Sequence, residues 1–161
     1  MKTFTILGAG WLGLELAKVL KSTYKIKVTS RNEEKLKMYE EEGFSSYILN
    51  ENNLNFLDEL LETNYLFINF PPSKFDDYLG FLDKIYCHKK IKNIEKIIFI
   101  SSTSIYPDIE GFFNEDFEIN SSSSKIVYDA EKLIENRSDI IFRVSALVGA
   151  NRISGRRFSA K

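Results

Sequence analysis

Short runs of apolar and β-branched residues alternate along the chain with longer segments in which apolar residues recur at helical spacing. The short runs predict β-strands, and most are continuously apolar, as is typical of strands covered by helices on both faces. The longer segments predict helices. The predicted strands are 3–7, 25–29, 46–49, 65–70, 97–101 and 140–144, and the predicted helices are 12–20, 33–42, 54–62, 74–85 and 125–135.

This alternation of strand and helix is typical of βαβ units, in which successive strands are parallel. We therefore predict an α/β Rossmann fold: a doubly wound parallel sheet of about six strands, in the order 3-2-1-4-5-6, with helices on both faces and ligand at the carboxyl ends of the strands. One polar, serine-rich segment, 108–124, interrupts the pattern. It is long for a loop in a compact domain, so it is either a functional or mobile segment or a disordered excursion.

The composition narrows the class of protein. With 43% hydrophobic and 28% charged residues the chain can bury a core, and 22 Lys and Arg against 23 Asp and Glu leave no basic field for nucleic acid or anionic lipid. Cys87 and His88 are the sole cysteine and histidine, too few for an internal disulfide or a zinc site. No apolar run has the length of a membrane span, and the N-terminus lacks a signal peptide's pattern. We therefore expect a cytoplasmic protein without metal, nucleic acid or membrane partners.

Three glycines follow the first predicted strand with the spacing G-x-G-x-x-G: Gly8, Gly10 and Gly13. In this motif the first glycine permits a tight turn, the second lets a pyrophosphate approach the backbone, and the third lets helix pack on strand. The helix that begins near Trp11 and Leu12 offers N–H groups and a partial positive charge to phosphates. The loop therefore predicts a dinucleotide site, with a glycine-rich turn that holds no ligand as the alternative.

The end of the second predicted strand bears on which dinucleotide is bound. An Asp or Glu at this position would accept hydrogen bonds from the ribose 2′-hydroxyl of NAD. The chain instead has Ser30 followed by Arg31, whose guanidinium suits a 2′-phosphate. We therefore predict NADP(H) as the cofactor, with NAD(H) as the alternative. The alternative to phosphate binding by Arg31 is that its side chain is simply solvated. The turn after the fourth strand is expected to be a wall of the cofactor cleft, or a plain strand end, and consists of Phe70, Pro71 and Pro72.

Two further segments could carry redox chemistry. The first is a run of hydroxyl residues at the end of the fifth predicted strand, which includes Ser102. The second contains Tyr128 and Lys132, which share one helix face because they are four residues apart. An ammonium in that position can lower the pKa of the phenol and so favour proton transfer. Tyr86 and Lys90 have the same spacing, but their helix precedes the Ser102 strand, so we select Tyr128 and Lys132 to face Ser102 across a cleft.

Together these residues resemble the short-chain dehydrogenase/reductase superfamily, and specifically its extended and atypical branch of NAD(P)-dependent epimerases and dehydratases. Its motifs recur in order over nearly the whole chain: the glycine loop, the Pro-Pro turn, S-S-x-S-I-Y-P, the Tyr-Lys helix, and a closing strand with Arg143 and Gly149. The resemblance implies catalytic roles for three residues. Tyr128 would be the general acid/base, and Lys132 would bind the nicotinamide ribose and lower the pKa of the tyrosine. Ser102 would be the hydrogen-bond partner of the reacting substrate oxygen, with Thr103 and Ser104 as fallback candidates for this role.

The resemblance further implies a sugar-like or other small hydroxyl or carbonyl substrate, such as a nucleotide sugar, and a homodimer. Two departures qualify this expectation. Leu7 stands where extended members have the first glycine of a longer motif. Members also continue beyond residue 161 into a portion that builds the substrate pocket, so we expect residues 1–161 to form a single NAD(P)-binding domain without that portion. The expected function is an NAD(P)-dependent oxidoreductase or epimerase, the alternatives being a non-catalytic NAD(P)-binding module or cofactor sensor and a fold with a vestigial pocket.

Overall fold

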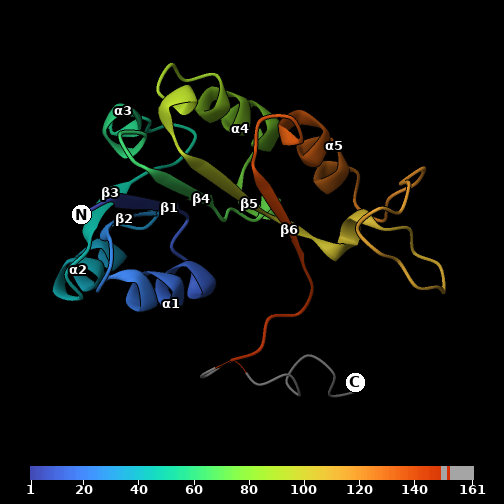
Figure 1. Cartoon of the computed structure of the whole chain (residues 1–161), viewed down its shortest axis with the longest axis horizontal. Helices are drawn as coiled ribbons and strands as arrows, with labels where there is room; N and C mark the ends of the chain where they lie inside the picture. Colours follow the sequence, from blue (N-terminus) through green and yellow to red (C-terminus); the bar gives the residue numbers. More distant parts are fainter. Residues whose placement is uncertain (150–151, 153–161) are drawn as a thin grey trace.

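The computed structural model describes residues 1–149 and 152. A six-stranded parallel sheet lies at the centre of the fold (Figure 1). The strands are β1 (Thr3–Leu7), β2 (Lys25–Ser30), β3 (Ser45–Ile48), β4 (Tyr65–Ile68), β5 (Lys96–Ser102) and β6 (Ile140–Val144). The helices are α1 (Trp11–Leu20), α2 (Glu34–Glu41), α3 (Leu57–Leu60), α4 (Tyr78–Tyr86) and α5 (Lys125–Ile134). The strand order, β3-β2-β1-β4-β5-β6, confirms the predicted doubly wound Rossmann fold.

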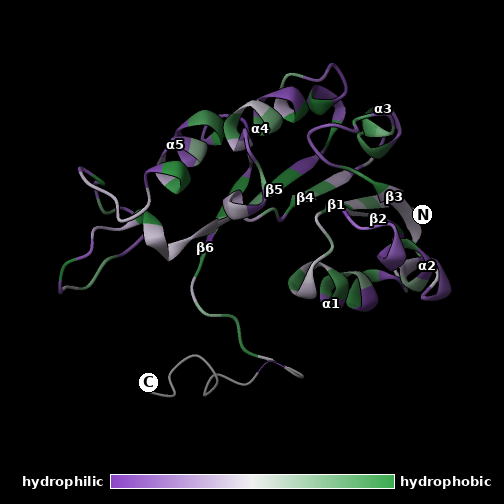
Figure 2. Ribbon diagram, turned by 180° about the vertical axis from the view of Figure 1, so that it is seen from behind, coloured by the Kyte–Doolittle hydropathy of each residue, from purple (hydrophilic) through white to green (hydrophobic). Residues whose placement is uncertain are grey.

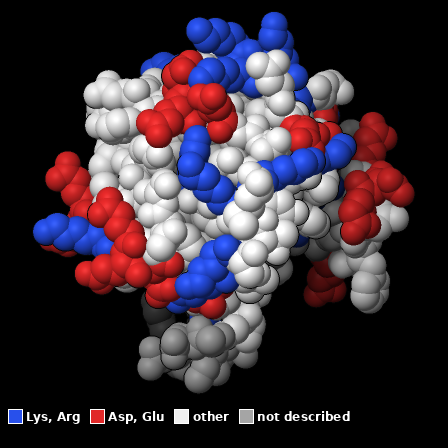
Figure 3. Space-filling model, turned by 60° about the vertical axis from the view of Figure 1, so that its left-hand side comes forward, with Lys and Arg blue, Asp and Glu red and all other residues white. Residues whose placement is uncertain are grey.

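Helices cover both faces of the sheet, with α1 and α2 on one face and α3, α4 and α5 on the other (Figure 1). Because successive residues of a strand point to opposite faces, each face has its own apolar core. In β5, Phe99 belongs to the core beneath α4 and α5, whereas Ile98 and Ile100 pack with the core on the side of α1. Apolar residues are correspondingly concentrated along the central strands in Figure 2. Acidic and basic side chains are interspersed on the surface seen in Figure 3.

The strand order reverses direction between β1 and β4, which are neighbours in the sheet. At this point the chain passes to α1 on one face and, after β4, to α4 on the other. The loops that leave the two strands therefore separate and open a crevice at their carboxyl ends, where open α/β sheets bind ligands. The glycine loop after β1 and the Pro-Pro turn after β4 both lie at this edge.

Two helices, α3 and α4, begin three or more residues later than predicted. The predicted helix 54–62 is a single turn, α3, because asparagine side chains upstream stabilise turns instead: the Asn50 side chain accepts from the Asn52 N–H and Asn53 from that of Asn55. The predicted helix 74–85 begins at Tyr78, where the Asp77 carboxylate accepts the Gly80 N–H at 2.9 Å and caps the helix. Residues 108–124 form neither helix nor strand.

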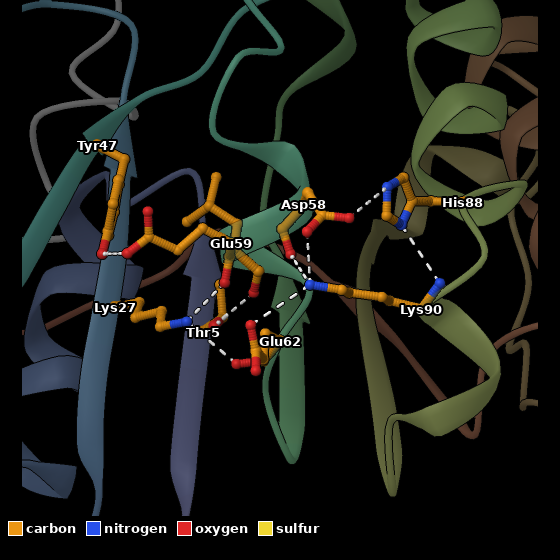
Figure 4. Close-up of polar contacts among 9 residues, drawn as sticks. Thr5, Lys27, Tyr47, Asp58, Glu59, Glu62, His88 and Lys90 are labelled. Carbon is orange, nitrogen blue, oxygen red and sulfur yellow. Dashed lines mark hydrogen bonds and ion pairs between the residues drawn. The ribbon is translucent and has the colours of Figure 1, made fainter.

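The single turn of α3 is secured by side chains that reach it from the sheet (Figure 4). The Lys27 ammonium, on β2, donates to the backbone carbonyls of Glu59 at 2.6 Å and Glu62 at 3.0 Å, and the Thr5 hydroxyl, on β1, donates to that of Leu60 at 3.0 Å. Lys27 is buried, and this burial lowers its pKa. These bonds satisfy carbonyls that so short a helix cannot satisfy itself.

Among residues 1–149 and 152, no helix combines the length and apolar character needed to cross a bilayer.

Candidate functional site

The three glycines of the loop between β1 and α1 have different structural roles. Gly8 has a φ of +87°, and a Cβ there would lie 2.6 Å from the Asn69 carbonyl oxygen. A Cβ at Gly13 would lie 2.9 Å from the Ile6 Cγ2 atom, so this position must be small for α1 to pack on β1. At Gly10 a Cβ would meet no atom within 4 Å. The fold therefore accounts for Gly8 and Gly13 but leaves open space at Gly10, which a ligand could occupy.

Side chains from the neighbouring strands hold the glycine loop in place. The Gly8 N–H donates to the Thr29 hydroxyl at 2.9 Å, and the Asn69 side-chain amide donates to the Gly8 carbonyl at 3.1 Å. Gly10 is the N-cap residue of α1, no side chain caps this helix, and its first turn contains no acidic residue. The positive end of the helix dipole thus faces the open space beside Gly10, an arrangement that favours an anion.

Two cavities meet at the glycine loop. The β5 cavity, of about 680 Å³, extends from Gly10 to the carboxyl end of β5 and the start of α5. The β2 cavity, of about 310 Å³, extends from Gly10 to the carboxyl end of β2. Both are lined by Gly10, Asn69, Phe70 and Pro71. A ligand that crosses the start of α1 could therefore extend into both cavities.

The β2 cavity is cationic. Arg31, Lys35 and Lys74 line it, and its lining within the described part of the chain includes no carboxylate. The Arg31 guanidinium lies 5.2 Å from the centroid of the Phe75 ring, close enough for a cation–π interaction. Ser30 also lines this cavity, and its hydroxyl accepts from the Asn32 N–H at 3.0 Å. The β2 cavity therefore favours a ligand group with negative charge.

The β5 cavity combines apolar walls with a group of hydroxyls. Ser102 and Ser104 bond each other, because the Ser102 hydroxyl oxygen accepts from the Ser104 N–H at 3.1 Å and lies 3.0 Å from the Ser104 hydroxyl. Arg152 is the one charged side chain among the described residues that line this cavity. Its apolar lining is formed by Trp11, Leu12, Phe70, Pro71, Pro72, Phe99, Ile100, Ile126, Val127, Ala130, Val144 and Leu147.

The structure brings most of the predicted cofactor residues to these two cavities, whereas Gly13, within α1, packs against Ile6 of β1. Those at the cavities are Gly8, Gly10, Trp11, Leu12, Ser30, Arg31, Phe70, Pro71 and Pro72. Ser102 lines the β5 cavity, with Ser104 beside it. Thr103 is exposed and does not line the β5 cavity, but it lines an adjoining depression together with Ser102 and Ser104.

Tyr128 and Lys132 do not line the β5 cavity. Ile126, Val127 and Ala130 are the α5 residues that do, and Tyr128 is about 200° around the helix from Ile126, since successive residues differ by about 100°. Lys132 is exposed, its ammonium lies 3.1 Å from the Glu135 carboxylate, and this hydrogen bond raises its pKa. That ammonium is 5.7 Å from the Tyr128 ring centroid. The two residues are neighbours on one helix face, as predicted. Neither of them lines the β5 cavity together with Ser102.

A buried ion pair lies on the neighbouring side of α5. Glu131 is 5% exposed, and its carboxylate accepts from Nε and Nη2 of Arg143, on β6, at 2.9 to 3.2 Å. This hydrogen bonding raises the pKa of Arg143. Arg143 also donates to the Tyr106 hydroxyl at 3.1 Å, and the Tyr106 ring stacks on Phe113. The pair therefore anchors the start of segment 108–124, which projects beside α5 in Figure 1.

Sequence reasoning missed several residues of the cavities. Lys35 and Lys74 were not singled out, although each follows shortly after a strand whose carboxyl end lies at the ligand edge. Asn69 directly follows β4 and bonds the glycine loop. Ser124, the last residue before α5, lines the β5 cavity. Polar residues just beyond each strand end were the available signal.

Comparison with known proteins adds relatives but no family assignment, since no family model matches the chain. Protein YeeZ of Escherichia coli strain K12 is 28% identical over 176 aligned residues, which cover 100% of this chain and 64% of YeeZ. The chain thus spans less than two thirds of the length of this relative.

Solved structures extend the comparison to the fold. A proposed NAD-dependent epimerase/dehydratase from Methylobacillus flagellatus matches 94% of this chain and 56% of its own, with a TM-score of 0.71 and 22% identity. UDP-N-acetylglucosamine 4-epimerase from Bacillus cereus matches 92% of this chain and 62% of its own, with a TM-score of 0.68 and 17% identity. The resemblance noted in the sequence is confirmed in the fold: this chain is similar, over nearly its whole length, to structures of the NAD-dependent epimerase/dehydratase type.

Proposed function

We propose that residues 1–161 form a single NAD(P)-binding domain. The observation that carries this proposal is the open space at Gly10, beside the uncapped start of α1 and between two cavities. A pyrophosphate at this point would lie against the N-terminus of α1, and the two halves of the dinucleotide would extend into the β2 and β5 cavities. The similar Methylobacillus flagellatus structure, named as a proposed NAD-dependent epimerase/dehydratase, supports the same cofactor class.

We further propose that the domain prefers NADP(H) to NAD(H). The support is the cationic β2 cavity, in which Arg31, Lys35 and Lys74 would surround a 2′-phosphate. A carboxylate, which would bond the 2′-hydroxyl of NAD, does not occur among the described residues of this cavity. The Phe75 ring would hold the Arg31 guanidinium in place when the cavity is filled.

Isothermal titration calorimetry with NADPH and NADH tests both statements. The chain should bind NADPH at least tenfold more tightly than NADH, a difference of about 1.4 kcal/mol. Arg31→Ala should remove most of this preference and leave the affinity for NADH within about threefold. Lys92→Ala, which removes an exposed cation that lines none of the described cavities, is the matched control and should change neither affinity. Equal affinity of the native chain for both nucleotides would contradict the preference.

For the whole protein we propose an NAD(P)-dependent oxidoreductase or epimerase that acts on a sugar-like or small hydroxyl or carbonyl substrate. The support is the fold shared with UDP-N-acetylglucosamine 4-epimerase, the β5 cavity, and the Ser102 hydroxyl at its edge. When bound, the cofactor would accept or donate a hydride. Ser102 would bond the reacting oxygen, while Tyr128 and Lys132 remain the predicted proton-transfer pair. From the composition we propose a cytoplasmic location, and from the same resemblance a homodimer, which light scattering of the purified chain can test.

A non-catalytic NAD(P)-binding module is the second candidate, and the position of Tyr128 and Lys132 outside the β5 cavity favours it. Turnover of UDP-N-acetylglucosamine with NADP⁺ or NAD⁺ separates the two candidates. An oxidoreductase or epimerase should lose turnover in Tyr128→Phe but retain it in Tyr86→Phe, the control with the same Tyr-Lys spacing. Cofactor binding without any turnover of sugar or carbonyl substrates would support the module. Turnover unchanged in Tyr128→Phe would remove the catalytic role of Tyr128.

A further inference from the structure

One buried hydroxyl in the described part of the chain has no hydrogen-bond partner, and it belongs to Ser101. The residue is 7% exposed, and its Oγ atom lies out of contact with solvent. A buried polar group without a partner destabilises a folded protein, so such groups are rare unless another molecule completes them. No sequence motif singled out Ser101 for a role of its own.

The surroundings of Ser101 show that the missing bond is particular to this residue. Ser102 and Ser104, next to it along the chain, bond each other. Thr5, which is fully buried on β1, donates its hydroxyl to the Leu60 carbonyl. Ser101 differs from these residues because it lines the β5 cavity and its buried Oγ atom has no hydrogen-bond partner among the described residues. Its χ1 angle is fixed by no hydrogen bond, so the hydroxyl can rotate between staggered positions toward a ligand.

The chemistry of the β5 cavity limits what that ligand group can be. Arg152, whose guanidinium lies over the Trp11 ring, is the one charged side chain of the described lining, and the Tyr78 hydroxyl already donates to the Phe70 carbonyl. Phe99, Val127 and Ala130, which lie on the same side of the sheet as Ser101, present apolar surface. A charged group between these residues and Ser101 would be poorly solvated. The site suits a flat, neutral group with a hydrogen-bonding edge.

The position of Ser101 along the sheet identifies which part of a dinucleotide would reach it. β5 is two strands from β1, so its end is about 10 Å from the glycine loop, at about 4.8 Å per strand. The cationic β2 cavity lies on the opposite side of that loop. A dinucleotide with its pyrophosphate at Gly10 and its adenosine 2′-phosphate among the cations would therefore extend its nicotinamide half toward β5.

We propose that the Ser101 hydroxyl is the hydrogen-bond partner of the nicotinamide carboxamide in the β5 cavity, an inference that rests on the proposed dinucleotide-binding function. In the free chain this hydroxyl is unpaired, and ligand binding supplies its partner. Ser101 thus selects and positions the nicotinamide half of the cofactor. Its unpaired buried hydroxyl lowers the stability of the free protein.

Ser101→Ala tests this proposal because it should change stability and affinity in opposite directions. Loss of an unpaired buried hydroxyl should raise the melting temperature of the free chain by about 3 °C. The affinity for NADP⁺ should fall about tenfold in calorimetry, whereas the affinity for 2′-phospho-ADP-ribose, which lacks nicotinamide, should stay within twofold. Thr5→Val is the matched control: it removes a buried hydroxyl that has a partner and lies away from the cavities, so it should lower the melting temperature and leave both affinities unchanged.

The outcomes separate this inference from the proposed function. If native chain binds NADP⁺ and Ser101→Ala binds it equally well, or loses affinity for both nucleotides alike, the role of Ser101 is wrong while dinucleotide binding stands. If the native chain binds neither NADP⁺ nor 2′-phospho-ADP-ribose, the proposed function fails and this inference fails with it. A lower melting temperature for Ser101→Ala would show that the hydroxyl has a partner in the free chain and would also overturn the proposal.

Discussion

Substitution of Gly10 by valine should separate ligand binding from folding. The residue has φ −71° and ψ −160°, a negative φ at the edge of the extended region, so the position does not need the left-handed conformation that favours glycine. A Cβ at this position meets no atom within 4 Å, so the side chain would occupy the space beside the start of α1 without displacing the protein. The same space is where a pyrophosphate would approach the backbone.

Two small effects on the free energy of unfolding should nearly cancel. Glycine is a better N-cap residue than valine, which costs Gly10→Val about 0.5 to 1 kcal/mol. Valine also restricts the unfolded chain more than glycine does, which raises the free energy of unfolding by about 0.4 to 1 kcal/mol. The melting temperature should therefore stay within about 3 °C of that of the native chain. Affinity for NADPH should fall at least about a hundredfold, or about 2.7 kcal/mol, because the valine methyls fill the phosphate position.

Gly43→Ala is the matched control, because its Cβ also meets open space but the residue has a φ of +89°. Strain at that angle should cost about 1 to 2 kcal/mol of stability, while NADPH binding, measured by calorimetry, should be unchanged. Native-like affinity in Gly10→Val would refute the role of the open space. A collapse of its melting temperature would refute the claim that the fold does not require this glycine.

Three further predictions concern stability and are measured by urea denaturation. Lys27→Met should lower the free energy of unfolding by about 2 kcal/mol, because the backbone carbonyls of Glu59 and Glu62 lose their buried donor. An unchanged free energy of unfolding would mean that water replaces the ammonium. Burial raises the pKa of Tyr86 to about 12, so the contribution of this tyrosine to the free energy of unfolding is present below its unfolded pKa of about 10 and is lost as pH rises through 12. Between about pH 9 and 12, Tyr86→Phe should therefore lose less stability than the native chain. Equal losses in the two proteins would contradict this. Glu131→Gln should cost about 3 kcal/mol, because it leaves the Arg143 guanidinium without its buried counter-charge, and a cost below about 1 kcal/mol would show that solvent screens the pair.

The fold could be predicted from the sequence because its strands are continuous apolar runs separated by helix-length segments. The central strand β4 contains no charged residue, and β5 is apolar from Ile97 to Ile100, so both can be recognised as strands that helices cover on both faces. The ends of helices depend on local hydrogen bonds instead. Asn50 and Asn53 side chains shorten α3, and the Asp77 cap delays α4, neither of which apolar periodicity can reveal.

The candidate site could be predicted only where one motif contains its residues. The glycine loop is local in sequence, and the structure explains Gly8 and Gly13 as the motif requires. The β2 cavity, in contrast, gathers Lys74 from beyond β4 beside Arg31 from beyond β2, and such proximity follows from the strand order rather than from spacing.

The orientation of α5 was a further limit of sequence reasoning. The spacing of Tyr128 and Lys132 indicates one helix face but cannot say where that face points. In the structure Val127 and Ala130 are the buried residues at the cavity, and their contacts with the sheet fix the rotation of the helix.

A crystal structure of the chain grown with NADP⁺ tests most directly whether a dinucleotide binds across the start of α1. The pyrophosphate should lie against the start of α1 beside Gly10, the 2′-phosphate among Arg31, Lys35 and Lys74, and the nicotinamide in the β5 cavity. A dinucleotide bound elsewhere on the chain, or crystals that contain none at saturating NADP⁺, would contradict it.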